Sequence, residues 1–198
     1  MNELSARVRL ASEAQPLPKM WIGILLGIMF LVMELIDAIL FQNGEIHSPL
    51  IDFKSPPALT TAYWLIGLII WIYWLYCVFK INEAVDRVPG YHHPITPARA
   101  VAFHFLPLFN IYWIFKWPTA LAKFVNWRMQ ARRMHGWIAG LLVLISVIIF
   151  RILDGFFGAM LLYGSGWYIN HWLRKAFTAP PVPESAMKPL SHSQILDL

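Results

Sequence analysis

Residues 20–41 read MWIGILLGIMFLVMELIDAILF, an apolar run of 22 residues that holds two charged side chains. A run of this length matches the roughly 20 residues that a helix needs to cross the hydrocarbon core of a bilayer. It is too long for the apolar core of a signal peptide, and no small-x-small cleavage site closes it, so we expect the mature protein to keep it. The run therefore predicts a first membrane-spanning helix.

Further apolar segments follow, and the breaks between them set their bounds. Residues 43–58 hold Asn-Gly, Ser-Pro and Pro-Pro pairs, which are typical of a loop, so we expect a second span over 59–79. The apolar stretch 136–172 would be about 55 Å long as a single helix, which exceeds the roughly 30 Å hydrocarbon core. The chain must therefore turn back, and the best break is at 151–155. The last two predicted spans are thus 137–153 and 156–173.

Composition agrees with a lipid solvent. Hydrophobic residues make up 58% of the 198 residues and charged residues 14%, whereas charged residues approach a quarter of a soluble domain. The net charge of +5 comes from basic residues beside the apolar segments, which favours orientation in an anionic membrane and argues against nucleic-acid binding. Cys77 is the single cysteine, so no disulfide can form within the chain. We expect an all-α membrane protein of four transmembrane helices, arranged as two hairpins.

The distribution of lysine and arginine predicts the topology. The N-terminal arm, 1–18, is polar and carries two arginines, whereas the loop 43–58 is poor in basic residues, so we expect the arm in the cytosol and the loop outside. The membrane domain would cover 19–175, and 176–198 would be a disordered proline-rich tail in the cytosol. Both termini are therefore expected on the cytosolic side.

Residues 100–130 are apolar enough to enter a membrane, yet they contain Pro107, Lys116 and Pro118. Three arginines lie within 128–133, so a full crossing here would put a basic cluster outside, against the positive-inside rule. We therefore expect a re-entrant or interfacial segment on the cytosolic side, made of short helices broken near Pro107 and Pro118. A fifth full crossing is the alternative.

Charged side chains inside the predicted spans form two pairs. Glu34 and Asp37 share a face of the first helix, and Arg151 and Asp154 share a face of the third. If the tryptophans that open these helices mark one membrane surface, both pairs lie at the same depth, where unpaired charge is costly. We predict that Arg151 pairs with Glu34 or Asp37. A structural clamp is the simpler interpretation, and a proton or ion relay is the alternative.

Glycine spacing predicts close helix packing. Gly23 and Gly27 on the first helix, and Gly136 and Gly140 on the third, each form a G-x-x-x-G pattern that lets two helix backbones approach. We expect the first and third helices to be a parallel, contacting pair.

Histidines give little support for a metal or haem. We interpret the neighbours His92 and His93 as part of a solvated loop, because no cysteine or carboxylate completes a metal-site spacing. His104 and His171 could ligate a haem if two helices brought them face to face. No metal site, cofactor or catalytic residue is predicted, since no H-E-x-x-H, P-loop or nucleotide-binding glycine motif occurs.

One short motif resembles a known family. Pro97-x-x-Ala100 leads into Phe105-Leu106-Pro107-Leu108-Phe109-Asn110-Ile111-Tyr112-Trp113. This segment resembles the hallmark of a bacterial membrane family catalogued as a domain of unknown function, in which two spans precede an aromatic F-x-P-x-x-N segment and further spans follow. Residues 115–118 depart from that pattern. The resemblance implies residence in the inner (plasma) membrane or an internal membrane of a bacterium, with no established activity.

The broken-helix motif is the place where we look for a site: Pro107, Asn110, Trp113 and Pro118. Pro107 frees a backbone carbonyl, and the Asn110 amide can satisfy such groups within a broken helix, so maintenance of the fold explains the motif. A docking site for a lipid, a quinone or a protein is the alternative.

These patterns predict a non-enzymatic accessory or scaffold component of a membrane assembly. Its expected partners are the lipid bilayer and another membrane protein, not nucleic acid. The alternatives are a binder or carrier of a lipophilic or ionic ligand, such as a lipid, a quinone or a proton, and an intramembrane enzyme.

Overall fold

The computed structural model describes residues 17–41, 57–88, 91–152 and 155–180, and every regular element within these ranges is helical. The long helices are α2 (Met20–Phe41), α3 (Pro57–Asp86), α5 (Pro107–Met129), α6 (Gly136–Ile152) and α7 (Gly155–Thr178). A short helix α4 (Pro97–Ala102) and a 3-10 turn η1 (Phe103–Phe105) precede α5. The all-helical class is confirmed for the described residues.

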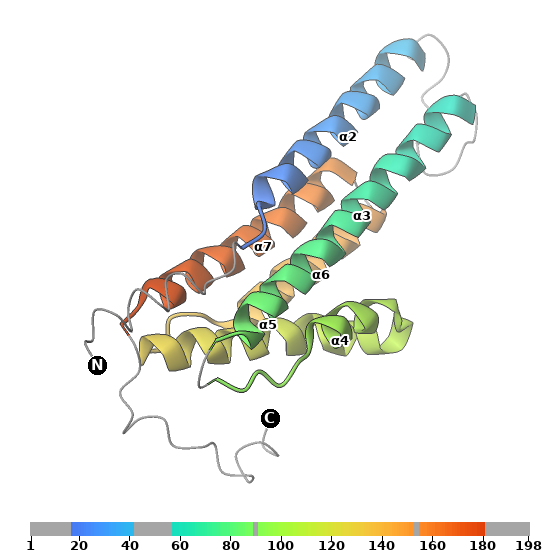
Figure 1. Cartoon of the computed structure of the whole chain (residues 1–198). Helices are drawn as coiled ribbons and strands as arrows, with labels where there is room; N and C mark the ends of the chain where they lie inside the picture. The colour runs from blue at the N-terminus through green and yellow to red at the C-terminus, as the bar shows by residue number, and fades with distance from the viewer. Residues whose placement is uncertain (1–16, 42–56, 89–90, 153–154, 181–198) are drawn as a thin grey trace.

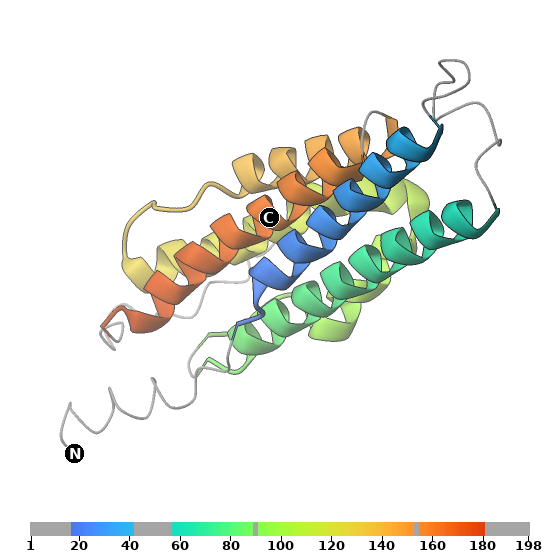
Figure 2. The same cartoon turned by 90° about the horizontal axis from the view of Figure 1, so that it is seen from above.

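Helices α2, α3, α6 and α7 run side by side, and α5 lies at an angle to them at one end (Figure 1). Seen from above, α2 lies beside both α3 and α7 (Figure 2), which agrees with its packing contacts. Helix α6 packs between α7 and α5, and α4 packs on α3. The α2–α3 and α6–α7 hairpins are thus joined through α7, while α4 and α5 close the end of the bundle.

Two helices continue past their predicted ends. Helix α3 extends to Asp86 instead of stopping at 79, because its last turns bury Ile81 and Val85 in the core. The predicted tail boundary at 176 is wrong, since α7 reaches Thr178. The ring of Phe177 lies 5.6 Å from that of Phe124, so packing against α5 keeps the end of α7 helical. The rest of the predicted tail, 181–198, and the arm 1–16 lie outside the described residues.

The two hairpins do not reach the same level. The ring of Phe30 on α2 lies 6.0 Å from that of Phe150 on α6, and a Cβ added at Gly155 would lie 2.3 Å from the Phe30 ring. The end of α6 and the start of α7 are therefore level with Phe30, although α2 continues to Phe41, about 16 Å farther. Figure 1 shows α2 and α3 extending beyond α6 and α7.

The starts of α2 and α6 also differ in level. Met20 lies against Gly166 of α7, whereas Phe150 lies against Gly158, and α6 begins fourteen residues before Phe150. Helices α6 and α7 are antiparallel, so Gly136 at the start of α6 is level with about position 172 of α7. Met20 is level with Gly166, six residues earlier in α7, so the two helix starts differ in level by about 9 Å. Trp21 and Trp137, which lie at the starts of α2 and α6, thus do not mark one membrane surface. The prediction that the two charged pairs lie at the same depth, which depends on these tryptophans, is wrong.

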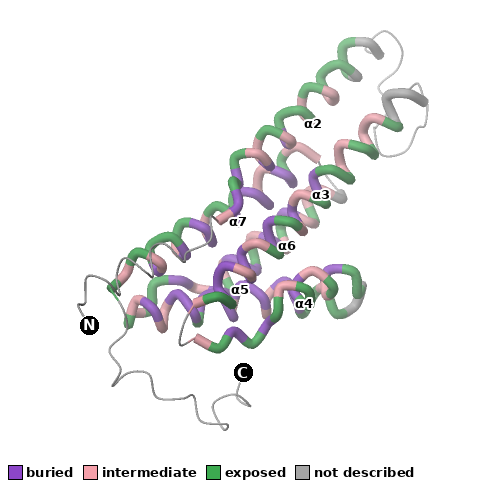
Figure 3. Tube along the Cα trace, viewed as in Figure 1, coloured by how far each residue is buried: buried purple, intermediate pink, exposed green. Residues whose placement is uncertain are grey.

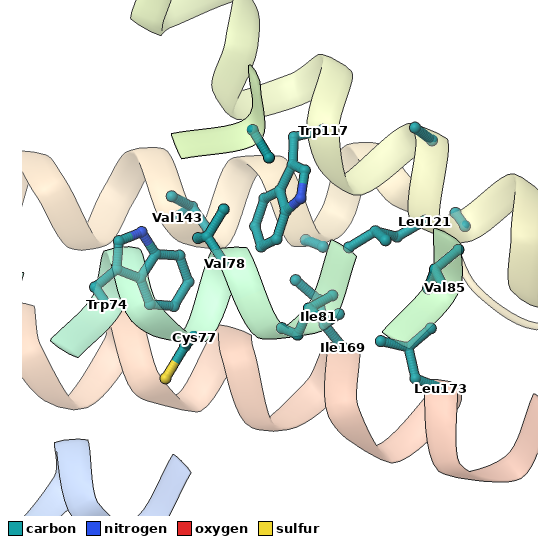
Figure 4. Close-up of a cluster of buried hydrophobic side chains, with 14 of the residues drawn as sticks. Trp74, Cys77, Val78, Ile81, Val85, Trp117, Leu121, Val143, Ile169 and Leu173 are labelled. Atoms are coloured by element: carbon teal, nitrogen blue, oxygen red, sulfur yellow. The ribbon is translucent and has the colours of Figure 1, made fainter. Parts of the chain in front are cut away.

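Large buried side chains fill the half of the bundle next to α5 (Figures 3 and 4). Trp74 of α3 and Trp117 of α5 meet edge to face with ring centroids 6.0 Å apart, and both are almost fully buried. Around them the close-up labels Cys77, Val78, Ile81, Val85, Leu121, Val143, Ile169 and Leu173. Toward their outer ends, the described residues of α2 and α3 are exposed or half-buried (Figure 3).

Among the described residues, the helix Thr61–Asp86 is long and apolar enough to cross a membrane by length and composition. Two further apolar helices, Met20–Ile36 and Gly136–Phe150, are shorter. The crossing of four helices therefore remains a proposal.

Candidate functional site

The corner between α4 and α5 is built around one carbonyl group. Thr96 caps α4, its Oγ1 accepting from the backbone N–H of Arg99 at 3.4 Å. The carbonyl oxygen of Ala100 then accepts from Nδ1 of His104 at 2.8 Å and from Nε1 of Trp113 at 3.2 Å. Because a carbonyl oxygen can only accept, Nδ1 of His104 carries the proton and Nε2 carries a lone pair.

The imidazole of His104 lies among aromatic rings. Its centroid is 6.1 Å from the Trp71 ring of α3 and 6.3 Å from the Trp117 ring of α5. Burial lowers the pKa of His104, although the bond to the Ala100 carbonyl opposes the shift. The neutral imidazole is therefore the form that this corner favours, and its first role is to tie η1 to α4.

Two residues of the broken-helix motif, Asn110 and Trp113, share a face of α5 with Trp117, because Trp113 and Trp117 lie three and seven residues after Asn110. The side-chain oxygen of Asn110 and Nε1 of Trp117 are both buried without a hydrogen-bond partner. The role predicted for Asn110, to satisfy a freed backbone carbonyl, would use its Nδ2 donor and not this oxygen, so it stays a prediction. Buried polar atoms without partners are rare in native proteins, so they mark this face as the part of α5 where a ligand group could bind.

The chain breaks before Pro107, and the break predicted near Pro118 is wrong. Leu106 is extended, as expected for the residue before a proline, and α5 then runs from Pro107 through Pro118 without interruption. Pro118 lacks the N–H that would bond the carbonyl of Ile114. A Cβ added at Gly140 would lie 3.0 Å from this oxygen, so packing of α6 covers the gap. Tertiary packing therefore overrides the local tendency to break.

The four packing glycines do permit close approach, but not between α2 and α6. A Cβ added at Gly23 would lie 2.1 Å from the Tyr163 ring, and one at Gly27 would lie 3.3 Å from Ala159, so both face α7. Gly136 and Gly140 instead face α5, where their added Cβ atoms would lie 2.3 Å from the backbone of Thr119 and 2.7 Å from the Phe115 ring. The predicted pairing of the first and third helices is wrong, because α7 and α5 take these surfaces.

The predicted charge cluster falls largely outside the described residues. The side chains of Asp37 and Arg151 and the whole of Asp154 are not described. Glu34 is partly buried and has an interaction within the protein. Since Phe30 is level with the α6–α7 turn, Glu34 lies one helical turn farther along α2. The pairing of Arg151 with Glu34 or Asp37 stays a prediction.

The two candidate haem ligands are not brought together. His104 is buried between Trp71 and Trp117, whereas His171 is exposed on α7, where its ring lies against Trp167 and Trp172. Within the described ranges, no three His, Cys, Asp or Glu side chains form a group that could hold a metal ion.

His93 is a structural residue that the sequence did not reveal. We expected the pair 92–93 in a solvated loop, and His92 is exposed, but His93 is buried. Its Nε2 lies 3.1 Å from Oδ1 of Asn82, whose Nδ2 donates to the Val78 carbonyl at 2.7 Å. Burial lowers the pKa of His93 to about 4, against an opposing effect of Asp86. The pair holds the loop between α3 and α4 against the end of α3.

The chain matches no protein-family model, no curated protein and no solved structure. The resemblance carried by residues 97–113 is thus neither supported nor contradicted, and it stays a prediction.

Proposed function

We propose that the protein is a multi-span membrane protein in which α2, α3, α6 and α7 cross the bilayer. The observation that carries this proposal is the apolar surface along the outer faces of three of these helices. More than a third of each of the following side chains is exposed: Leu25, Val32 and Leu35 on α2, Leu65, Leu68 and Ile72 on α3, and Leu141, Ile145 and Ile148 on α6. Soluble monomers rarely expose apolar patches of this extent, whereas lipid tails solvate them.

Charge supports the proposed orientation. Basic residues of the described ranges gather where α2 begins, α3 and α7 end, and α6 begins: Lys19, Lys80, Arg87, Arg132, Arg133, Arg174 and Lys175. The opposite ends of the four helices carry Arg151 as their one basic residue within the described ranges. By the positive-inside rule, the basic end faces the cytosol. The α4–α5 segment then lies at the cytosolic interface, without a fifth crossing.

Within the membrane we infer an accessory or scaffold role, because buried polar side chains of the membrane-crossing helices bond the protein's own backbone. Tyr163 donates its hydroxyl proton to the Ile70 carbonyl at 2.6 Å, and Ser165 donates to the Leu162 carbonyl at the same distance. The Tyr163 bond joins α7 to α3, and the Ser165 bond lies within α7. Large aromatic side chains fill the space between the helices. Such an interior favours a protein that acts through its outer surface.

Cysteine labelling tests the membrane topology. In a Cys77→Ala background, single cysteines are placed at Ser48 in the predicted outer loop, and at His92 and Arg132 in the predicted cytosolic segments. We expect a membrane-impermeant maleimide to label the first from outside and the other two only after the membrane is opened. Labelling of Arg132→Cys from outside would mean that α5 crosses the bilayer, and it would overturn the proposed orientation.

Native mass spectrometry after mild solubilisation tests the accessory role. We expect one membrane-protein partner at fixed stoichiometry. The second candidate function, a carrier of a lipophilic ligand, is favoured by the unpartnered Trp117 Nε1 and Asn110 Oδ1. It predicts instead a bound small molecule, lost in the Trp117→Phe variant and visible by mass or by absorption. If neither partner nor ligand is found, the accessory role loses its support.

A further inference from the structure

The α4–α5 segment and the turn that follows it carry basic side chains without any acidic one. Between residues 97 and 135 the chain has no Asp or Glu, and its basic residues are Arg99, Lys116, Lys123, Arg128, Arg132 and Arg133. At the end of α3, by contrast, Glu83 accepts from both Lys80 and Arg87 at 2.7 Å. The positive charge of the segment is therefore not balanced by acids of its own.

Two of these lysines lie on the same face of α5. Lys116 and Lys123 are seven residues apart, which is two helical turns. Burial lowers the pKa of Lys123, and the positive charge of Lys116 lowers it further. The two ammonium groups therefore repel each other. The Lys116 Nζ lies 5.8 Å from the centre of the Tyr112 ring, which places an aromatic ring beside the charge.

The turn after α5 adds two arginines, and side-chain bonds from α5 hold its backbone. Asn126, one turn beyond Lys123, accepts through Oδ1 from the backbone N–H groups of Arg133 and Met134, at 2.8 and 2.9 Å. Its Nδ2 donates to the Met134 carbonyl at 3.0 Å. These bonds hold the turn against α5 and leave the side chains of Arg132 and Arg133 exposed. We call Lys116, Lys123, Arg132 and Arg133 the basic surface.

Exposed apolar side chains on the same segment identify the kind of partner. The helix break and the first turns of α5 expose Phe105, Leu106, Phe109, Ile111 and Tyr112. Basic residues next to exposed aromatic and aliphatic residues are typical of a segment that lies in the membrane interface, where apolar groups enter the tails and cations meet phosphates. Nucleic acid would match the charge but not the aliphatic residues.

We propose that the basic surface binds the headgroups of anionic phospholipids in the cytosolic leaflet. This inference rests on the proposed membrane residence and adds a lipid class to it. Each basic side chain near an anionic surface contributes about 1 kcal/mol, so loss of two should lower the preference for anionic lipid roughly thirtyfold.

The test uses the full-length protein in nanodiscs of phosphatidylcholine mixed with phosphatidylglycerol, with retained lipids counted by native mass spectrometry. We expect the wild type to retain phosphatidylglycerol preferentially, K116Q/K123Q to lose this preference, and K116R/K123R to keep it. The matched control is R174Q/K175Q, which removes two charges at the same end of the bundle, outside the basic surface. If the control lost the preference for phosphatidylglycerol to the same extent, net charge alone would explain the effect. This result would overturn the proposal.

Three other readouts separate the possible failures. Release of the protein from membranes by alkaline carbonate would refute the membrane proposal itself. Retention in the membrane without preference for phosphatidylglycerol would refute the lipid inference alone. RNA binding that K116Q/K123Q abolishes, with no change in lipid preference, would replace the lipid by nucleic acid. Thermal unfolding in detergent checks that each variant is folded.

Discussion

Asn170 of α7 donates its Nδ2 proton to the carbonyl oxygen of Pro18 across 2.8 Å, which joins two residues 152 positions apart in the sequence. On the neighbouring helix, the Tyr73 hydroxyl donates to the carbonyl of Lys19 at 2.7 Å. The two residues that precede α2 are thus held between α3 and α7. These bonds fix where α2 begins. Neither donor, Asn170 or Tyr73, belongs to a recognisable sequence motif.

Asn170→Ala should destabilise the protein by about 1 kcal/mol, because the buried carbonyl of Pro18 loses its donor. Unfolding by sodium dodecyl sulfate, followed by circular dichroism, measures the change. His171→Ala is the matched control, since His171 is the next residue of α7 and its side chain is exposed. Equal midpoints for Asn170→Ala and the wild type would mean that the bond contributes nothing.

Gly136→Ala should cost roughly 1–3 kcal/mol, the usual range for overpacking. Its new Cβ would lie 2.3 Å from the Cα of Thr119, so the backbone of α5 or α6 must move. Gly164→Ala is the control, because its Cβ would meet no atom within 4 Å. In a helix this change should be neutral or gain up to about 1 kcal/mol from helix propensity. Thermal melts of both variants decide whether close α5–α6 packing is required.

Stability should fall as the pH is lowered from about 6.5 to 4, in part through His93. Its pKa is about 4 in the folded protein and 6.5 ordinarily, so the unfolded chain binds a proton in this window that the folded chain does not. The shift corresponds to a loss on the order of 3 kcal/mol. His93→Gln should flatten the pH dependence of unfolding, leaving the part due to His104.

The control for this titration is His92→Gln, since His92 is the exposed neighbour. It should leave the slope unchanged. If the free energy of unfolding of His93→Gln depended on pH as steeply as that of the wild type, His93 would be excluded as the cause of the pH dependence.

Phe177→Ala should destabilise the protein by about 2 kcal/mol, because the ring packs on Phe124 and is partly buried. Arg174→Ala, at an exposed position of the same helix end, should have little effect. Chemical denaturation of the two variants side by side measures the difference. If Phe177→Ala were as stable as Arg174→Ala, the last turn of α7 would not be anchored on α5.

Charge exchange tests the predicted pairing of Arg151 with Glu34 or Asp37. Arg151→Glu should abolish accumulation in the membrane, since a buried charge without a partner costs several kcal/mol. Glu34→Arg, alone or with Asp37→Arg, should restore the level measured by immunoblot. Failure of both combinations would exclude the pairing.

Local patterns were enough to predict the helices themselves. The run 20–41 is α2 without a shift of either end, and the helical stretches expected near 59–79 and 137–173 are present. The break before Pro107 was also predictable, because a proline restricts the residue before it whatever the tertiary context. Helix ends were less predictable: α3 and α7 run on because Ile81 and Phe177 find partners on other helices.

Partners across the bundle could not be predicted. A G-x-x-x-G pattern indicates that a close neighbour exists but not which one, so it does not reveal that Gly23 packs on α7. The burial of His93 in its loop is not predictable, because the eleven positions that separate it from Asn82 give no periodic signal. The sequence shows the lysines and arginines of the basic surface without acids among them, but not the bonds by which Asn126 holds the turn that carries the two arginines.

The helical, apolar character of the chain and the places where charge and proline interrupt it follow from local sequence, because helix propensity and hydropathy are sums over neighbouring residues. Only the tertiary contacts decide that α5 continues through Pro118, that α2 packs mainly on α7 and α3, and that the residues before α2 are held by Asn170. Each of these depends on contacts between residues far apart in the chain, whose free energies no local pattern contains.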